Sequence, residues 1–163
     1  MAMTNDKIHI IATGGTIDAV FSPKEYKPVP NTKTAIPDFI INYIRPHFEI
    51  TTSTVAMIDS LYMTDEIRAE ILKEIQHVKC KKILITHGTD GMIATAKYLE
   101  KNKDLYKNAT IVLTGSMIPL IGFSPSDAGF NLGFALSSLQ NMPSGIFISM
   151  NGQIFEPFNT KKK

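Results

Sequence analysis

The stretch Lys7-Ile8-His9-Ile10-Ile11-Ala12-Thr13-Gly14-Gly15-Thr16-Ile17-Asp18 indicates which fold this chain adopts. Its first half is a nearly unbroken apolar run, which is typical of a strand buried on both faces of a parallel sheet. The two glycines that follow allow a tight turn and a close approach of the backbone to a ligand. Because ligands bind at the carboxyl ends of strands in open α/β sheets, we expect Thr16 to lie at a binding edge.

A second stretch repeats this arrangement: the apolar run 82–86 leads into His87-Gly88-Thr89-Asp90-Gly91. Two hydroxyl groups at two strand ends can face one pocket, and Asp90 adds an acid–base group, which suits a hydroxyl nucleophile with its own activating groups. Each motif alone also fits a helix N-cap or a weak phosphate-cradling loop. The Walker pattern and the dinucleotide pattern G-x-G-x-x-G are both absent from these stretches.

Short apolar runs alternate with helical patterns along the chain, which favours βαβ units and a parallel sheet. We therefore predict an α/β protein with a flavodoxin-like three-layer fold and a five-stranded parallel sheet. The expected strands are residues 7–13, 48–56, 82–87, 109–114 and 145–150. After the last strand we expect a turn and a short extended piece.

The segments between these strands predict one long loop and four helices. Residues 19–34 contain three prolines and several charges, and a loop of this length is often a lid or a binding segment. Thr64 is the expected cap of the clearest helix, and the third helix is expected to begin just after Asp90, where its dipole favours negative charge. The helices are expected over residues 35–46, 64–78, 92–103 and 125–140.

The expected helix 125–140 follows Ser124-Pro125, which we interpret as a capping serine before a first-turn proline. Its body is apolar on nearly all sides, so it needs burial all round. A domain of 163 residues rarely covers an outer helix completely, and we therefore expect a homo-oligomer that pairs through this helix.

Composition excludes several classes of protein. At 163 residues with 44% hydrophobic and 20% charged residues, the chain is expected to form one soluble globular domain. A net charge of +2 gives no reason to expect nucleic acid as a partner, and no apolar stretch reaches the roughly 20 residues that span a membrane. We see no signal peptide, and the single cysteine, Cys80, fits a reducing cytoplasm. The histidines His9, His47 and His77 are scattered, so we expect no metal site.

Five segments together resemble the amino-terminal domain of the L-asparaginase family, in the family's order and over nearly the whole chain. They are Ala12-Thr13-Gly14-Gly15-Thr16-Ile17, Asp59-Ser60, His87-Gly88-Thr89-Asp90, Leu113-Thr114-Gly115-Ser116-Met117-Ile118-Pro119 and Ser126-Asp127-Ala128-Gly129-Phe130-Asn131-Leu132. The resemblance implies an amidohydrolase that converts L-asparagine to L-aspartate and ammonia through a threonine nucleophile, without a cofactor. Two alternatives stay open: a related amidase acting on glutamine or another small amide, and a non-catalytic domain that binds a small ligand.

The resemblance also assigns roles to individual residues. It makes Thr16 the nucleophile and implies a relay of Thr89, Asp90 and Lys162. Tyr26 matches the family's lid tyrosine, and packing of its loop onto the surface is the other interpretation of this residue. Lys161 takes the place of Lys162 if the match slips by one residue, and a solvated basic tail is the other interpretation of this segment. The expected substrate-binding residues are Gly15, Asp59, Ser60, Gly88 and Ser116.

Two further expectations concern specificity and domain organisation. Many members of the family have glutamine where this sequence has Leu61, a difference that bears on substrate preference. Full-length members continue into a smaller carboxy-terminal domain. We expect residues 1–163 to form a single amino-terminal-like domain from which that second domain is absent.

Overall fold

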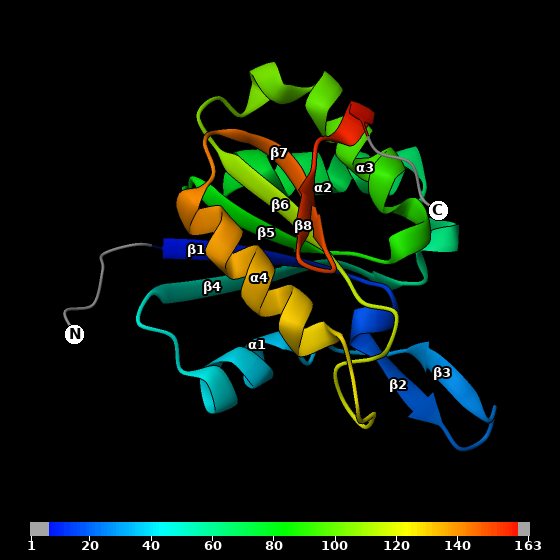
Figure 1. Ribbon diagram of the computed structural model, residues 1–163. Coiled ribbons are helices and arrows are strands. Elements are labelled where there is room, and N and C mark those ends of the chain that lie inside the picture. Colours follow the sequence, from blue (N-terminus) through cyan, green and yellow to red (C-terminus); the bar gives the residue numbers. More distant parts are fainter. Residues whose placement is uncertain (1–6, 160–163) are drawn as a thin grey trace.

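A mixed sheet forms the centre of the molecule in the computed structural model, which describes residues 7–159 (Figure 1). In spatial order its strands are β4 (Glu49–Ile58), β1 (Lys7–Gly14), β5 (Lys82–Thr86), β6 (Thr110–Thr114), β7 (Gly145–Met150) and β8 (Gln153–Phe155). The first five are parallel, and β8 pairs antiparallel with β7. The prediction of a parallel sheet is confirmed, and the sheet gains a sixth strand from the short extended piece after β7.

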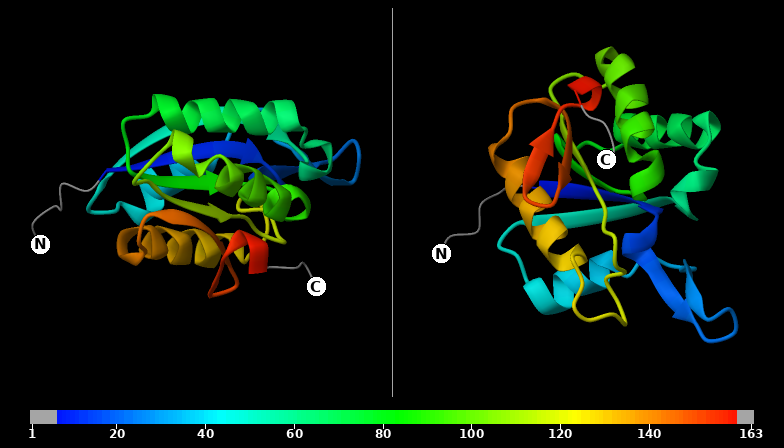
Figure 2. Two further views of the ribbon diagram at one scale, coloured as in Figure 1. Left: turned by 90° about the horizontal axis from the view of Figure 1, so that it is seen from above. Right: turned by 45° about the vertical axis from the view of Figure 1, so that its right-hand side comes forward.

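Helices cover both faces of this sheet, so the three-layer prediction is confirmed (Figure 2, left). One face carries α2 (Asp65–His77) and α3 (Thr89–Lys101), and the other carries α4 (Ala128–Asn141) and α1 (Ile36–Phe39), which continues as the π-helical turn η2 (Ile40–Ile44). In β5, Ile83 and Ile85 enter the core under α2 and α3, whereas Leu84 enters the core under α4. Alternating side chains of buried strands thus build two cores.

Helix α2 begins as the sequence predicts, because the hydroxyl oxygen of Thr64 accepts the backbone N–H of Ile67. Helix α3 begins earlier than predicted: Gly88 is its N-cap, and Thr89 and Asp90 form its first turn rather than the loop before it. Both side chains therefore belong to the amino-terminal turn of α3 rather than to a loop.

The start of α4 also differs from the prediction. The bond Ser124–Pro125 is cis, and the helix begins only at Ala128. The carboxylate of Asp127, at the N-cap position, accepts the backbone N–H groups of Met117 and Ile118, each at 2.9 Å. This residue therefore holds the loop that follows β6 instead of capping its own helix.

Residues 19–34 are not a structureless loop, and that prediction is wrong. They form an antiparallel hairpin of β2 (Ala19–Ser22) and β3 (Lys27–Pro30), which projects from the body of the molecule (Figure 1). A strand with two prolines is tolerated here because β3 has a partner on only one side within a two-stranded sheet.

The apolar side chains of α4 face the sheet. Leu132, Ala135 and Leu139 are buried, whereas Gly129 and Gly133 point outward with Phe130, which is 62% exposed. The outer face therefore carries small residues beside the stacked rings of Phe130 and Phe134, rather than apolar side chains on all sides. The expected homo-oligomer stays a prediction.

No helix within residues 7–159 is long and apolar enough to cross a membrane.

Candidate active site

The carboxyl ends of β1, β4 and β5 meet at one edge of the sheet. β1 lies between the other two, with Gly14 opposite Ile58 of β4 and Ala12 opposite Thr86 of β5. The backbone N–H of Gly15 then donates to the carbonyl of Ile58 at 2.8 Å. Because parallel strands end at the same edge, the segments that follow all three strands lie side by side.

Three small residues bring these segments into direct contact. Gly15 has a φ of 81°, and a Cβ atom at this position would overlap the backbone nitrogen of Gly88. A Cβ atom on Gly88 would in turn overlap the side chain of Ser60. Only glycine fits at both positions, so the two glycine-containing motifs and the Asp59-Ser60 segment lie in direct contact.

The predicted catalytic side chains from β1 and β5 follow these two glycines directly. Thr16 opens the 3-10 turn η1 (Thr16–Asp18) and is partly buried. Thr89 is the first residue of α3, and its hydroxyl lies 3.9 Å from the sulfur of Met117. Asp90, the next residue, is exposed. The structure therefore brings Thr16, Thr89 and Asp90 to the same edge of the sheet.

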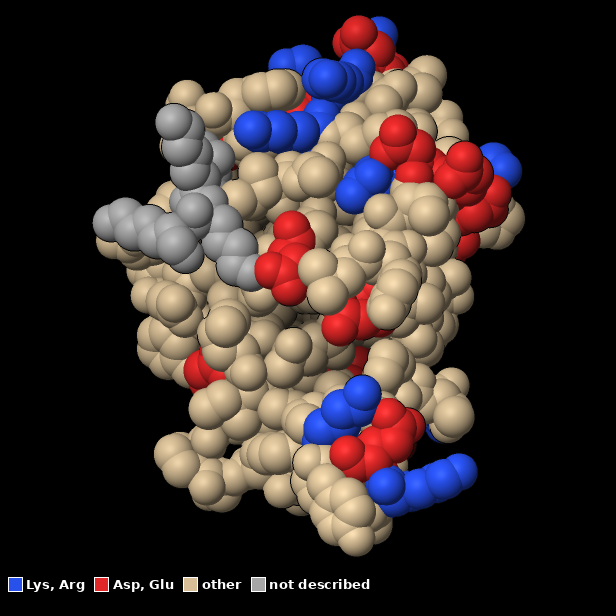
Figure 3. Space-filling view, turned by 90° about the vertical axis from the view of Figure 1, so that its right-hand side faces the viewer, with Lys and Arg blue, Asp and Glu red and all other residues tan. Residues whose placement is uncertain are grey.

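The carboxyl edge of the sheet faces the viewer in Figure 3. Acidic side chains are scattered from its top to the β2–β3 hairpin, whereas the basic ones lie mostly towards its top and on that hairpin (Figure 3).

The predicted substrate-binding side chains are already bonded within the protein. The oxygen of Ser60 accepts the N–H of Gly91 at 3.2 Å, and Asp59 accepts the N–H of Leu61 at 3.0 Å. Ser116 is buried after β6, and its hydroxyl donates to the carbonyl of Ile118 at 2.6 Å. These bonds fix Ser60 under the first turn of α3. They hold Ser116 in the buried segment that follows β6.

One predicted catalytic residue, Tyr26, lies apart from this cluster. Tyr26 is at the tip of the β2–β3 hairpin, with a φ of 54° and an exposed fraction of 85%. Its side chain points into solvent rather than closing over Thr16. Lys162, and Lys161 beside it, lie outside the described residues. The last described element, η5 (Pro157–Asn159), packs against α3, where the ring of Phe158 lies under the ammonium group of Lys97.

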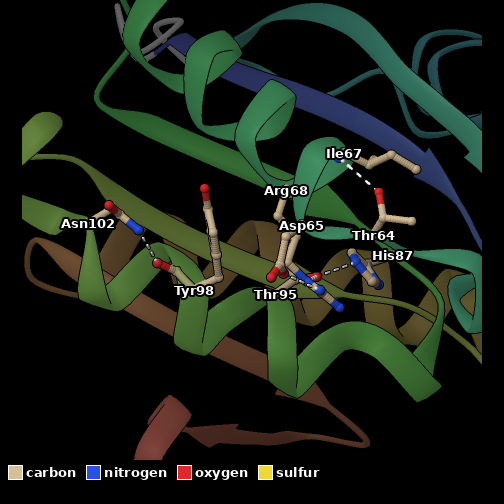
Figure 4. A network of polar contacts seen from close by, with 8 residues as sticks. All are labelled: Thr64, Asp65, Ile67, Arg68, His87, Thr95, Tyr98 and Asn102. Atoms are coloured by element: carbon tan, nitrogen blue, oxygen red, sulfur yellow. Dashed lines mark hydrogen bonds and ion pairs between the residues drawn. The ribbon is translucent and has the colours of Figure 1, made fainter.

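His87 is a buried residue that contacts the start of α3 through Gly88 and Thr95. It is fully buried, with Nδ1 at 2.7 Å from the carbonyl of Gly88 and Nε2 at 2.9 Å from the hydroxyl of Thr95 (Figure 4). Burial lowers the pKa of His87 to about 4, so the ring is neutral at physiological pH. A neutral ring that is bonded on both sides within the core suits a structural residue rather than a general base.

The neutral state of His87 predicts an acid-dependent loss of stability. Because its pKa is about 4 in the folded protein and 6.5 in the reference state, the unfolded chain binds its proton first as the pH falls. The free energy of unfolding should drop by about 3 kcal/mol between pH 6.5 and pH 4. Urea titrations across this range should show that the free energy of unfolding of His87→Gln depends less on pH than that of the wild type. The control His77→Gln, at an exposed position, should show the same pH dependence as the wild type. Parallel curves for the wild type and His87→Gln would rule this explanation out.

Asp18 is a second buried titratable group, and the sequence analysis missed it. It is 2% exposed, and one carboxylate oxygen accepts the N–H of Ala35 at 2.8 Å. Burial raises the pKa of Asp18, and the nearby Thr34 hydroxyl and Ala35 amide oppose this rise. Asp18 directly precedes β2 and Ala35 lies beyond β3, so the bond ties together the two ends of the hairpin that carries Tyr26.

Three other residues near the site had no catalytic signal in the sequence. Met117 reaches Thr89, Thr95 bonds to His87, and Arg68 donates its Nε–H to Thr95 at 3.2 Å. No sequence motif marks these residues as catalytic, and their partners become visible only in the folded structure. Within residues 7–159, no group of three or more His, Cys, Asp or Glu side chains could hold a metal ion.

Comparisons with known proteins agree with this geometry. The family model described as Asparaginase, N-terminal, matches residues 7–163. The chain is 30% identical over 166 residues to the glutaminase-asparaginase of Acinetobacter glutaminasificans, with 92% of this chain and 47% of the relative covered. It is 27% identical over 163 residues to L-asparaginase 2 of Escherichia coli K12, with 95% and 46% covered.

Solved structures give the same result. The thermostable L-asparaginase from Thermococcus kodakarensis matches with a TM-score of 0.78 and 27% identity, covering 93% of this chain and 46% of that one. L-asparaginase I from Vibrio cholerae O1 biovar eltor matches with a TM-score of 0.79 and 26% identity, covering 98% and 49%. The chain thus spans about half the length of the relatives it matches. Because the family model covers residues 7–163, the chain belongs to the asparaginase family, in the part described by the family's amino-terminal domain.

Proposed function

We propose that this chain hydrolyses the side-chain amide of L-asparagine to L-aspartate and ammonia, with Thr16 as the nucleophile. The contact between Gly15 and Gly88 carries the proposal, because it sets Thr16 beside Thr89 where β1 and β5 end. The similarity of the chain to asparaginases and to a glutaminase-asparaginase supports the substrate class.

The proposed reaction has two steps. The hydroxyl oxygen of Thr16 attacks the amide carbon, the C–N bond breaks, and the nitrogen takes up a proton and leaves as ammonia. Water then hydrolyses the resulting ester, which frees aspartate and restores the hydroxyl. The proton of Thr16 passes into a relay of Thr89, Asp90 and Lys162 and returns to the leaving nitrogen. The lysine of this relay is assigned from the family resemblance and lies outside the described residues.

The first turn of α3 suits the substrate carboxylate. Backbone N–H groups and the positive end of the dipole lie at this terminus, which favours a negative group. Ser60 fixes the turn through Gly91, and the close contact of Gly15 with Gly88 holds the end of β1 against this turn. We assign Asp59 to the substrate amine and the hairpin with Tyr26 to closure over Thr16.

Glutamine is the second candidate substrate. The Acinetobacter relative is named glutaminase-asparaginase, and this chain carries an exposed Leu61 beside Ser60. Ammonia release from asparagine, glutamine and other small amides by the purified chain separates these substrates. Release from none of them, together with measurable binding of asparagine, would favour the non-catalytic binding domain instead.

Asp90 gives a specific test of the relay. We expect Asp90→Asn to lower kcat by about 10²–10⁴-fold, because proton transfer is needed mainly in the transition state, and to change KM only a few-fold. Steady-state ammonia release measures both constants. Asp104→Asn, the same exchange on an exposed residue beyond the far end of α3, should match the wild type. A raised KM with an unchanged kcat for Asp90→Asn contradicts the relay role.

We also propose a cytoplasmic enzyme. A structure from Campylobacter jejuni is described as a probable cytoplasmic L-asparaginase. It matches with a TM-score of 0.77 and 28% identity, and the match covers 94% of this chain and 46% of that one. The single cysteine of this chain, Cys80, is a free thiol that donates to the carbonyl of Lys7 at 3.0 Å.

A further inference from the structure

Hydrogen bonds run in one direction from Arg68 of α2 through Thr95 to His87 (Figure 4). A further bond runs from His87 to the peptide that precedes Thr89. The carbonyl of Gly88 can only accept, so Nδ1 of His87 carries the proton. In the neutral ring Nε2 is then an acceptor, and the hydroxyl of Thr95 donates to it. Arg68 donates its Nε–H to the same hydroxyl oxygen, which leaves the hydroxyl proton directed at His87.

We propose that His87, Thr95 and Arg68 are positioning residues that aim the Gly88–Thr89 peptide for catalysis. The inference rests on the proposed function, in which Thr89 belongs to the relay. Arg68 and Thr95 select the tautomer of His87 that can hold the Gly88 carbonyl, and the held carbonyl orients the backbone of Thr89.

The geometry of the peptide bond explains the effect on Thr89. In a trans peptide the carbonyl and the N–H group point in opposite directions. Since the carbonyl of Gly88 is held towards the buried ring, the N–H of Thr89 points away from the ring and out of the first turn of α3. Gly88 has no Cβ to restrict its own backbone, so the conformation at this junction depends on an external hydrogen bond.

Packing leaves the imidazole ring little freedom to move. A Cβ atom on Gly91 would lie 3.2 Å from Cε1 of His87, and one on Gly115 would overlap the carbonyl of His87. The ring therefore fills the space under the first turn of α3, and its hydrogen bonds set the position of that turn. The outer end of the network is an ion pair of Arg68 with Asp65 at 2.7 Å, in which Asp65 is largely exposed.

Substitutions of Thr95 test the proposal in the full 163-residue chain. Thr95→Val keeps the shape of the side chain but removes the hydroxyl, so the tautomer of His87 is no longer selected. We expect kcat for asparagine to fall about tenfold with KM nearly unchanged, the loss that follows from one displaced hydrogen bond. Thr95→Ser restores the hydroxyl and should restore kcat to within about twofold. Equal kcat values for Thr95→Val and the wild type would overturn the proposal.

Arg68 provides a second, graded test with a matched control. Arg68→Lys keeps the positive charge but lacks the Nε–H group, and it should lower kcat in the same direction as Thr95→Val. Asp65→Asn removes only the exposed ion pair and should leave kcat within about twofold, since such pairs contribute little. A larger loss for Asp65→Asn than for Arg68→Lys contradicts a role that acts through Thr95.

Nuclear magnetic resonance of the ¹⁵N,¹³C-labelled chain keeps this inference separate from the proposed function. The wild type and Thr95→Ser should show His87 protonated at Nδ1. Thr95→Val should show a mixture of tautomers and shifts of the Gly88 carbonyl and Thr89 amide signals, while Gly133→Ala leaves both in place. If the wild type releases no ammonia, the proposed function fails and these signals alone decide. A ring protonated at Nε2, or a Thr89 amide that does not respond to Thr95→Val, would refute the network.

Discussion

Thr16→Ala is expected to lose at least about 10⁴-fold of kcat for asparagine, because it removes the only atom that can form the acyl bond in the proposed mechanism. Thr16→Ser keeps a hydroxyl and should retain part of the activity. Both variants should stay folded, since Thr16 lies at the partly exposed edge of the sheet and outside both cores.

Steady-state ammonia release measures this effect, and thermal unfolding reports on the fold. The matched control is Thr52→Ala, the same exchange at an exposed position of β4, which should leave kcat unchanged. Activity of Thr16→Ala within tenfold of the wild type would remove Thr16 as the nucleophile. Loss of activity with a large fall in melting temperature would make Thr16 a structural residue instead.

Gly15→Ala is expected to lower the free energy of unfolding by about 3 kcal/mol or more. The substitution places a Cβ atom on a backbone with a φ of 81° and against the backbone of Gly88, where no flexible side chain can give way. Any folded fraction must separate β1 from the start of α3, so the distance between Thr16 and Thr89 should grow and kcat should fall as well.

Gly133→Ala is the control for this experiment. It lies inside α4 with no atom within 4 Å of the added carbon, and alanine in a helix interior should stabilise the protein by about 0.5–1 kcal/mol. Urea unfolding of both variants gives opposite signs if the contact between Gly15 and Gly88 holds the site together. An unchanged unfolding midpoint for Gly15→Ala would mean that this contact is absent in solution.

The central strands and α2 could be predicted from sequence because their signals are local. Runs such as 82–86 are rich in Ile, Leu and Thr, which predicts a buried strand. In the structure this run forms β5, whose residues after Lys82 are buried. Thr64 and the apolar stripe that follows it mark the start of α2. The β2–β3 hairpin was missed because Pro28 and Pro30 argue against a strand, and only the absence of a second neighbour for β3 makes them acceptable.

The part of the candidate site that could be predicted from sequence is the part formed by motifs at strand ends. Glycines at 15 and 88 indicate where the backbone approaches something closely, and the structure identifies that partner as the other glycine. The first turn of α3 was misjudged because Gly88 caps it without a side chain, so the usual capping signal is missing. The contacts of His87 with Thr95, and of Asp18 with Ala35, depend on how distant elements pack, and no local pattern encodes them.

The most direct test of the central claim is to trap the acyl-enzyme. The wild-type chain is mixed with asparagine, quenched in acid within the first turnovers, digested, and analysed by mass spectrometry. We expect an aspartyl ester on the peptide that contains Thr16, and no adduct on Thr16→Ala. An ester on Thr89, or steady ammonia release with no covalent adduct on either threonine, would contradict the account.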